Sequence, residues 1–185
     1  MGTEEIALKN KKIIIVVGFL IFVVASLFYF YRPSYTENNV TIKTELVDPF
    51  SSLMNPAQAQ DILKNANYSV EVIEDSKLEN GDTRPAFSIL SWKIKNYEHL
   101  GIKGTLTITF FNQQMASTRF YPNDHLAYAD LFSKKVGLEL KEGTTSNVPP
   151  KTNLQYKKDL DGNFYFEWQD KDLQNQIDDW IKTYS

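Results

Sequence analysis

Apolar residues form one uninterrupted block near the N-terminus, at residues 13–31 (IIIVVGFLIFVVASLFYFY). As an α-helix, these nineteen uncharged positions would be about 28 Å long, close to the ~30 Å hydrocarbon core of a bilayer. The alternative is a cleaved signal peptide, whose apolar core is only about 7–15 residues long. Because the block continues beyond the small residues Ala25 and Ser26, the pattern predicts an uncleaved transmembrane helix.

The charges beside this block predict its orientation. Lys9, Lys11 and Lys12 come directly before it, whereas Arg32 and then Lys43 follow it among acidic residues. Basic residues are enriched on the cytoplasmic side of a span, so we expect the N-terminus in the cytoplasm. The expected organisation is a cytoplasmic N-terminus (1–12), a transmembrane helix (13–31), a juxtamembrane stalk (32–50) and an extracytoplasmic domain (51–185).

Helical periodicity recurs at three places in residues 51–185. Asn55-Pro56 is a typical helix start, and residues 59, 62, 63 and 66 after it are apolar on one face. A second helix is predicted between a cap at Asn123 or Asp124 and the closing Gly137. A third is predicted from about Lys171, with an apolar stripe at positions 173, 177, 180, 181 and 184.

The segments between these helices have the period-two pattern of strands. The clearest is 105–110, where threonine alternates with apolar residues. Turn residues separate it from 115–121, and Asp161-Gly162 separates a later pair. Strands are expected at 69–74, 86–95, 105–110, 115–121, 153–158 and 163–168, with a further short one in 138–141 and a loop over 143–151.

The order of these elements predicts an α+β domain. Short connections between successive strands make a meander and a hairpin, which are antiparallel. We therefore expect an antiparallel sheet with about three helices packed on one face.

The net charge of residues 32–185 argues against a nucleic-acid partner. The first 31 residues contain three of the 20 lysines and arginines and two of the 23 acids, which leaves 17 against 21. A nucleic-acid-binding surface needs a basic footprint, so we expect no nucleic-acid partner. The chain has no cysteine, which rules out disulfides and thiol chemistry. Lysine far outnumbers arginine, a bias that favours an AT-rich, bacterial genome.

Two patterns contain residues that could hold a metal ion, but each is better explained without one. His99, in a predicted turn at 96–101, and His125, in the first turn of a predicted helix, are far apart in sequence. They lack metal-ligand spacing, so both are interpreted as surface or capping residues. The segment from Asp159 to Asp170 has oxygen ligands at several positions of a calcium loop, but Phe164 stands where that loop requires glycine. A hairpin turn is the better interpretation.

No catalytic signature is present. The sequence has no GxSxG or SxxK motif, no P-loop and no paired carboxylates outside polar surfaces. We therefore assign no catalytic, cofactor-binding or metal-binding residue and expect a protein that is not an enzyme. An enzyme whose carboxylates come together from distant positions remains a lesser alternative.

Aromatic residues make up 14% of the chain and concentrate in the predicted strands. Most must form the core, but adjacent pairs such as Phe110-Phe111 and Phe120-Tyr121 point to opposite faces of a strand. We therefore expect some aromatic side chains on the other face of the sheet, where tyrosine and tryptophan often serve as interface anchors.

These patterns favour a single-pass protein of the cell envelope, such as the bacterial inner membrane (its domain periplasmic if the cell is Gram-negative). Its predicted function is protein binding, as a subunit or assembly factor of a membrane complex. The alternatives are a module that binds a small ligand or lipid, and an inhibitor or immunity protein acting at the envelope. We expect the membrane and a nearby protein as partners, and no cofactor.

Overall fold

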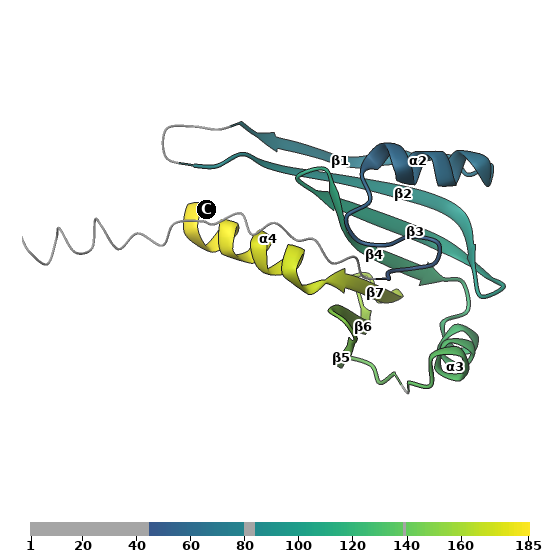
Figure 1. Cartoon of the computed structure of the whole chain (residues 1–185). Coiled ribbons are helices and arrows are strands. Elements are labelled where there is room, and N and C mark those ends of the chain that lie inside the picture. The colour runs from purple at the N-terminus through teal and green to yellow at the C-terminus, as the bar shows by residue number, and fades with distance from the viewer. Residues whose placement is uncertain (1–44, 80–83, 139) are drawn as a thin grey trace, which may run out of the picture. The chain divides into compact units, whose positions relative to one another are not determined.

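The computed structural model describes residues 45–79, 84–138 and 140–185 (Figure 1). The predicted span at 13–31 lies outside these residues. Within the described part of the chain, no helix combines the length and apolar character that a bilayer crossing requires.

The described residues form an antiparallel sheet and three helices, which confirms the predicted α+β class. The helices are α2 (Pro56–Asn65), α3 (His125–Val136) and α4 (Lys171–Tyr184). The strands are β1 (Glu71–Leu78), β2 (Phe87–His99), β3 (Ile102–Phe111), β4 (Gln114–Pro122), β5 (Thr145–Val148), β6 (Thr152–Lys158) and β7 (Phe164–Asp170).

Seven strands lie in the order β1-β2-β3-β4-β7-β6-β5, and every neighbouring pair is antiparallel. The first four strands form the predicted meander, and β6 and β7 form the predicted hairpin. After β4 the chain crosses through α3 and returns as β5, so that β7 pairs with β4 in the middle of the sheet. Among the described residues, β1 and β5 are the two edges.

One face of the sheet is the main core. Trp92 pairs with Ile108 across β2 and β3, and Leu154 pairs with Trp168 across β6 and β7; all four side chains are buried. Helix α2 covers this face through Ala59 and Leu63, and α3 through Tyr128 and Phe132. Burial of this continuous apolar surface is the main stabilising term of the fold.

Residues 45–50, predicted as the end of a juxtamembrane stalk, are packed into the folded domain; the rest of the predicted stalk lies outside the described residues. Leu46, Val47 and Phe50 are 6%, 1% and 2% exposed and belong to the main core. The amide of Val47 donates a hydrogen bond to the Thr118 hydroxyl at 3.2 Å. Residues 45–50 lack any clear periodicity because they form a tight turn, bridged from Glu45 to Ser51, and not a helix or strand of the sheet.

The prediction that all three helices pack on one face is wrong. Leu173 and Ile177 of α4 pack against Phe111 and Ile89, which form a second cluster on the opposite face. Alternation along β3 causes this division, because Phe110 points into the main core and Phe111 points away from it. Figure 1 shows α4 continuing directly from the end of β7.

Two further elements differ from their predictions. Strand β2 extends to His99, through a bulge at which Asn96 has a φ of 57°, so the expected turn at 96–101 is confined to its last residues. Residues 145–148, expected in a loop, form the edge strand β5, whereas residues 138, 140 and 141 are outside any strand. Strand β5 (TSNV) has a single apolar residue, Val148, which packs against the main core, so its sequence shows no apolar alternation.

Candidate functional site

The second face of the sheet is polar from one edge to the other. A single row of paired positions crosses all seven strands of the described sheet, and every member is polar or charged: Glu71, Lys93, Thr107, Arg119, Glu167, Gln155 and Thr145. Helix α4 covers only the end of this face that lies around Phe111. Among the described residues, no helix covers the part of the face around Lys93, Thr107 and Arg119, and we call this part the open face.

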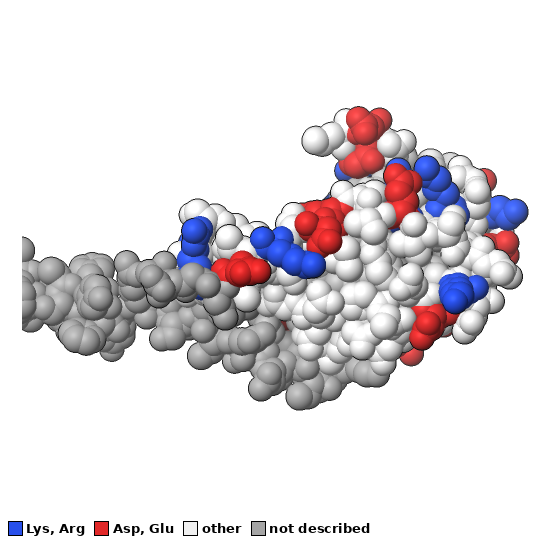
Figure 2. Space-filling model, turned by 90° about the horizontal axis from the view of Figure 1, so that it is seen from above, with Lys and Arg blue, Asp and Glu red and all other residues white. Residues whose placement is uncertain are grey.

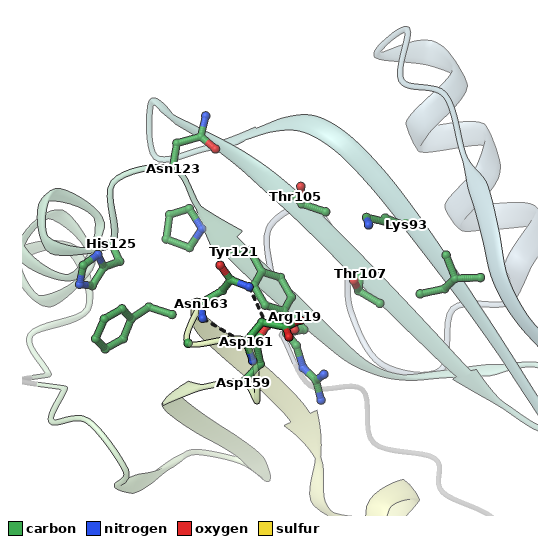
Figure 3. A pocket seen from close by; sticks show the side chains of 14 residues that line it. Lys93, Thr105, Thr107, Arg119, Tyr121, Asn123, His125, Asp159, Asp161 and Asn163 are labelled. Atoms are coloured by element: carbon green, nitrogen blue, oxygen red, sulfur yellow. Dashed lines mark hydrogen bonds between the residues drawn. The ribbon is translucent and has the colours of Figure 1, made fainter.

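A cleft of about 760 Å³ lies on the open face. Its floor consists of side chains from β2, β3 and β4, with Ile73 of β1 at one side. The turn between β6 and β7 and the junction between β4 and α3 form its other walls. Figure 3 shows Lys93, Thr107 and Arg119 on neighbouring strands, with Asp159 and Asp161 beside them on the turn.

Arg119 is held in place at the floor of the cleft. Its Nε and Nη2 atoms donate hydrogen bonds of 3.2 and 2.7 Å to Oε1 of Glu167, which is 5% exposed. The guanidinium also lies 4.7 Å from the ring centroid of Tyr165, which packs on Tyr121 of the cleft floor. Burial lowers the pKa of Arg119, but the charge and hydrogen bonds of Glu167 outweigh this, so the pKa is raised overall.

Lys93 is the second cation of the cleft. It is half-buried, and its cross-strand neighbours are Glu71 on β1 and Thr107 on β3. The Glu71 carboxylate pairs instead with Lys95, at 3.1 Å. Among the described residues, no salt bridge reaches Lys93.

The turn between β6 and β7 is the segment that resembled a calcium loop. Asp159 accepts hydrogen bonds from the backbone N–H groups of Asp161 and Asn163, at 3.0 and 2.8 Å. Its oxygens therefore close a hairpin turn, as the sequence predicted. In the described ranges, no group of three or more acidic, histidine or cysteine side chains is placed to hold a metal ion.

The two histidines lie in different environments. His125 is part of the cleft wall and stacks on Phe164, with ring centroids 3.9 Å apart. His99 is 9% exposed, so its interpretation as a surface or capping residue is wrong. Its Nδ1 lies 2.6 Å from the Tyr128 hydroxyl, inside the main core and away from the cleft lining.

Two charged groups of the cleft lining, Asp159 and Arg119, have shifted pKa values. Desolvation raises the pKa of Asp159, but the hydrogen bonds from Asn163 and Asp161 outweigh it and leave the pKa below its ordinary value. The pKa of Arg119 is raised above its ordinary value. Both shifts stabilise the charged forms at neutral pH, whereas a general acid or base needs a pKa near the working pH.

Sequence reasoning assigned no site residue, and it missed this set. Lys93 and Arg119 come from strands 26 positions apart in the chain, and Thr107 lies between them only because of the register of β3. The signal that could have found them is the polar half of each alternating strand. The expected aromatic side chains on the second face are there, in Phe111, Tyr121 and Tyr165.

Comparison of the chain with models of known protein families and with curated proteins finds no match. The cleft and its charges are therefore the basis on which a function is proposed.

Proposed function

We propose that this chain is a single-pass membrane protein whose extracytoplasmic domain binds a protein partner through the cleft of the open face, without catalysis. The observation that carries the proposal is the polar row across the sheet, which α4 leaves open around Lys93, Thr107 and Arg119. A protein interface commonly has a polar rim and anchors of tyrosine and arginine. Arg119 and Tyr121 have those properties here.

The predicted span and the early start of the folded part support a membrane-bound partner. Glu45 already pairs with Ser51, so at most residues 32–44 separate the predicted span from described structure. Thirteen extended residues reach about 45 Å. A domain tethered this closely meets partners in or on the same membrane at a high effective concentration.

A small-molecule ligand is the second candidate, because the cleft volume of about 760 Å³ falls within the range of small-ligand sites. Such sites are mostly lined by apolar side chains, however, and this floor is formed mainly by threonine, lysine and arginine. Protein binding therefore fits the lining better.

Co-purification from gently solubilised membranes tests the proposal. The tagged full chain should retain a stoichiometric protein partner, and Thr107→Trp, which fills the cleft floor, should lose it. Gln60→Trp, at an exposed position of α2, is the matched control and should keep the partner. Equal retention by both variants, or a chain that purifies alone, would contradict the proposal.

The anchor itself is tested separately by washing membranes with alkaline carbonate. An uncleaved span keeps the chain in the membrane pellet, because a transmembrane helix is not released by charge repulsion at high pH. Release of the chain into the supernatant would show that residues 13–31 do not span the membrane.

A further inference from the structure

The row of residues that crosses the cleft has two cations at its centre and an acid on each side of them. Across neighbouring strands the order is Glu71, Lys93, Thr107, Arg119 and Glu167, so Thr107 lies between two cations that are flanked by acids. Strands are spaced about 4.8 Å apart, which places the backbones of Lys93 and Arg119 about 10 Å apart. Both side chains are long enough to reach a group seated above Thr107.

The two flanking acids are not equivalent. The Arg119 guanidinium has five N–H donors and uses two of them to bind Glu167, so it retains donors for another acceptor. Glu71 is engaged by Lys95, which leaves the Lys93 ammonium without a salt bridge among the described residues. Thr107 adds a hydroxyl that can donate a hydrogen bond to an anion.

Two salt bridges lie along β1. Lys77 lies 3.6 Å from Asp75, and Lys95 lies 3.1 Å from Glu71. Figure 2 shows acidic and basic side chains interspersed on the side of the molecule that carries β1 and α2. The cleft lining as a whole is balanced, with Lys93 and Arg119 against Asp159 and Asp161. Lys93, however, has no salt bridge among the described residues, so positive charge is available locally beside Thr107.

We propose that the cleft binds an extended acidic segment of the protein partner, with one carboxylate seated over Thr107 between Lys93 and Arg119. This inference rests on the proposed function and specifies the chemistry of the partner. Charge complementarity carries it: a charge-assisted hydrogen bond to an ammonium or guanidinium is stronger than a neutral one. The cleft is open along the face, which suits a chain segment lying across the strands.

The opposite wall of the cleft sets a limit on that segment. Asp161 is exposed on the β6–β7 turn, and its neighbour Asp159 is held in its charged form by the turn. A carboxylate placed near Asp161 is repelled, which favours the position over Thr107 and away from the turn. Removal of the Asp161 charge should therefore strengthen binding of an acidic probe.

The test uses the full chain in nanodiscs of phosphatidylcholine, which carries no net charge, and titrates acetyl-hexaglutamate-amide by calorimetry. Binding should be salt-sensitive, and acetyl-hexalysine-amide should not bind at the same concentrations. Lys93→Gln should weaken binding about tenfold, the loss expected for one charge-assisted contact. Lys64→Gln, at an exposed position of α2 outside the cleft, is the control and should change binding less than about twofold, because exposed charges contribute little.

Asp161→Asn should have the opposite effect on affinity: it removes a negative charge from the cleft wall and should tighten hexaglutamate binding. Equal losses in the Lys93 and Lys64 variants would overturn the proposal, because they would indicate general charge attraction without a specific site. Binding of tripolyphosphate with no binding of hexaglutamate would overturn it in favour of a phosphate ligand. If hexaglutamate fails to bind but Thr107→Trp still releases a co-purifying protein, the inference fails while protein binding stands.

Discussion

Arg119 and Glu167 face each other across β4 and β7, and the shortest distance between their charged atoms is 2.7 Å, from Nη2 to Oε1. The pair lies beneath the cleft, with the carboxylate almost fully buried and the guanidinium partly open to solvent. It fixes the one arginine of the floor and, through Tyr165, the packing of Tyr121. The geometry of the cleft therefore depends on a buried acid that does not line it.

Replacement of Glu167 should destabilise the fold. Glu167→Gln removes the charge that Arg119 requires, and we expect a loss of about 1–3 kcal/mol in the free energy of unfolding, measured by urea denaturation. Lys134→Gln, which breaks the exposed pair with Asp130, is the control and should cost less than about 0.5 kcal/mol. Similar effects from both substitutions would mean that the buried pair contributes no more than a surface one.

Stability should fall as the pH drops because of His99. Burial, together with the Lys135 charge, lowers the pKa of His99 from 6.5 to about 4. The unfolded chain therefore takes up a proton near pH 6.5, while the folded chain resists it down to about pH 4. This group's contribution is fully present above pH 6.5 and is lost between these values, by about 3 kcal/mol.

The check on this prediction is urea unfolding at a series of pH values between 7 and 4. His99→Gln should have a shallower decline than the unsubstituted chain, whereas His125→Gln, in the cleft wall, should follow the original curve. A His99→Gln curve parallel to that of the unsubstituted chain would contradict the assignment.

The start of α4 depends on a buried cap. Asp170 is 0% exposed, and its Oδ1 accepts hydrogen bonds from the amides of Asp172 and Leu173. Its other oxygen lies 3.5 Å from the Lys151 ammonium, which is itself buried. Asp170→Ala should therefore cost about 3 kcal/mol, the sum of a lost cap and an ammonium left with Asp172 alone.

The matched comparison is the cap of α3. Asp124 is exposed and accepts one hydrogen bond, from the amide of Ala127 at 2.9 Å. Asp124→Ala should cost about 1 kcal/mol, and Asp170→Asn, which keeps the capping oxygen, should fall between the two alanine variants. Equal costs for the two alanine variants, measured by thermal unfolding, would be inconsistent with a role for Lys151.

Gly104 allows β3 and β4 to approach closely at the cleft end of the sheet. A Cβ atom at this position would overlap the backbone oxygen of Tyr121 and lie 2.9 Å from the Phe120 ring. Gly104→Ala should therefore cost about 2–3 kcal/mol through overpacking. Gly162→Ala, in open space but at a φ of 85°, should cost only about 1 kcal/mol. A smaller loss for Gly104→Ala than for Gly162→Ala would contradict this account.

Much of the fold could be predicted because alternation along single strands encodes it. The threonines at 105, 107 and 109 predicted β3, and Asn55 and Gly137 marked helix ends where the structure has them. The side of the sheet that α4 covers could not be predicted in the same way. The face that α4 covers depends on Phe111 and Ile89 lying side by side on neighbouring strands. That neighbourhood depends on the register of β2 and β3, which is set by the whole sheet.

The cleft could not be predicted for a related physical reason. In the sequence, Lys93 and Arg119 are each an ordinary polar position of an alternating strand. Only the pairing of β2 and β4 with β3 places them on either side of Thr107. Burial of His99 was also missed, because the predicted turn at 96–101 concealed the extension of β2. The position of the cleft and the burial of His99 both depend on contacts between segments that are distant in the sequence. Local sequence patterns do not reveal such contacts.

Site-specific photo-crosslinking in intact membranes tests the central claim, protein binding through the cleft, most directly. A benzophenone side chain is introduced at Thr105, in the cleft floor, and separately at Gln60, on the exposed side of α2. The proposal predicts one discrete crosslinked protein from Thr105 and none from Gln60. No crosslinked protein from Thr105, or the same product from both positions, would contradict it.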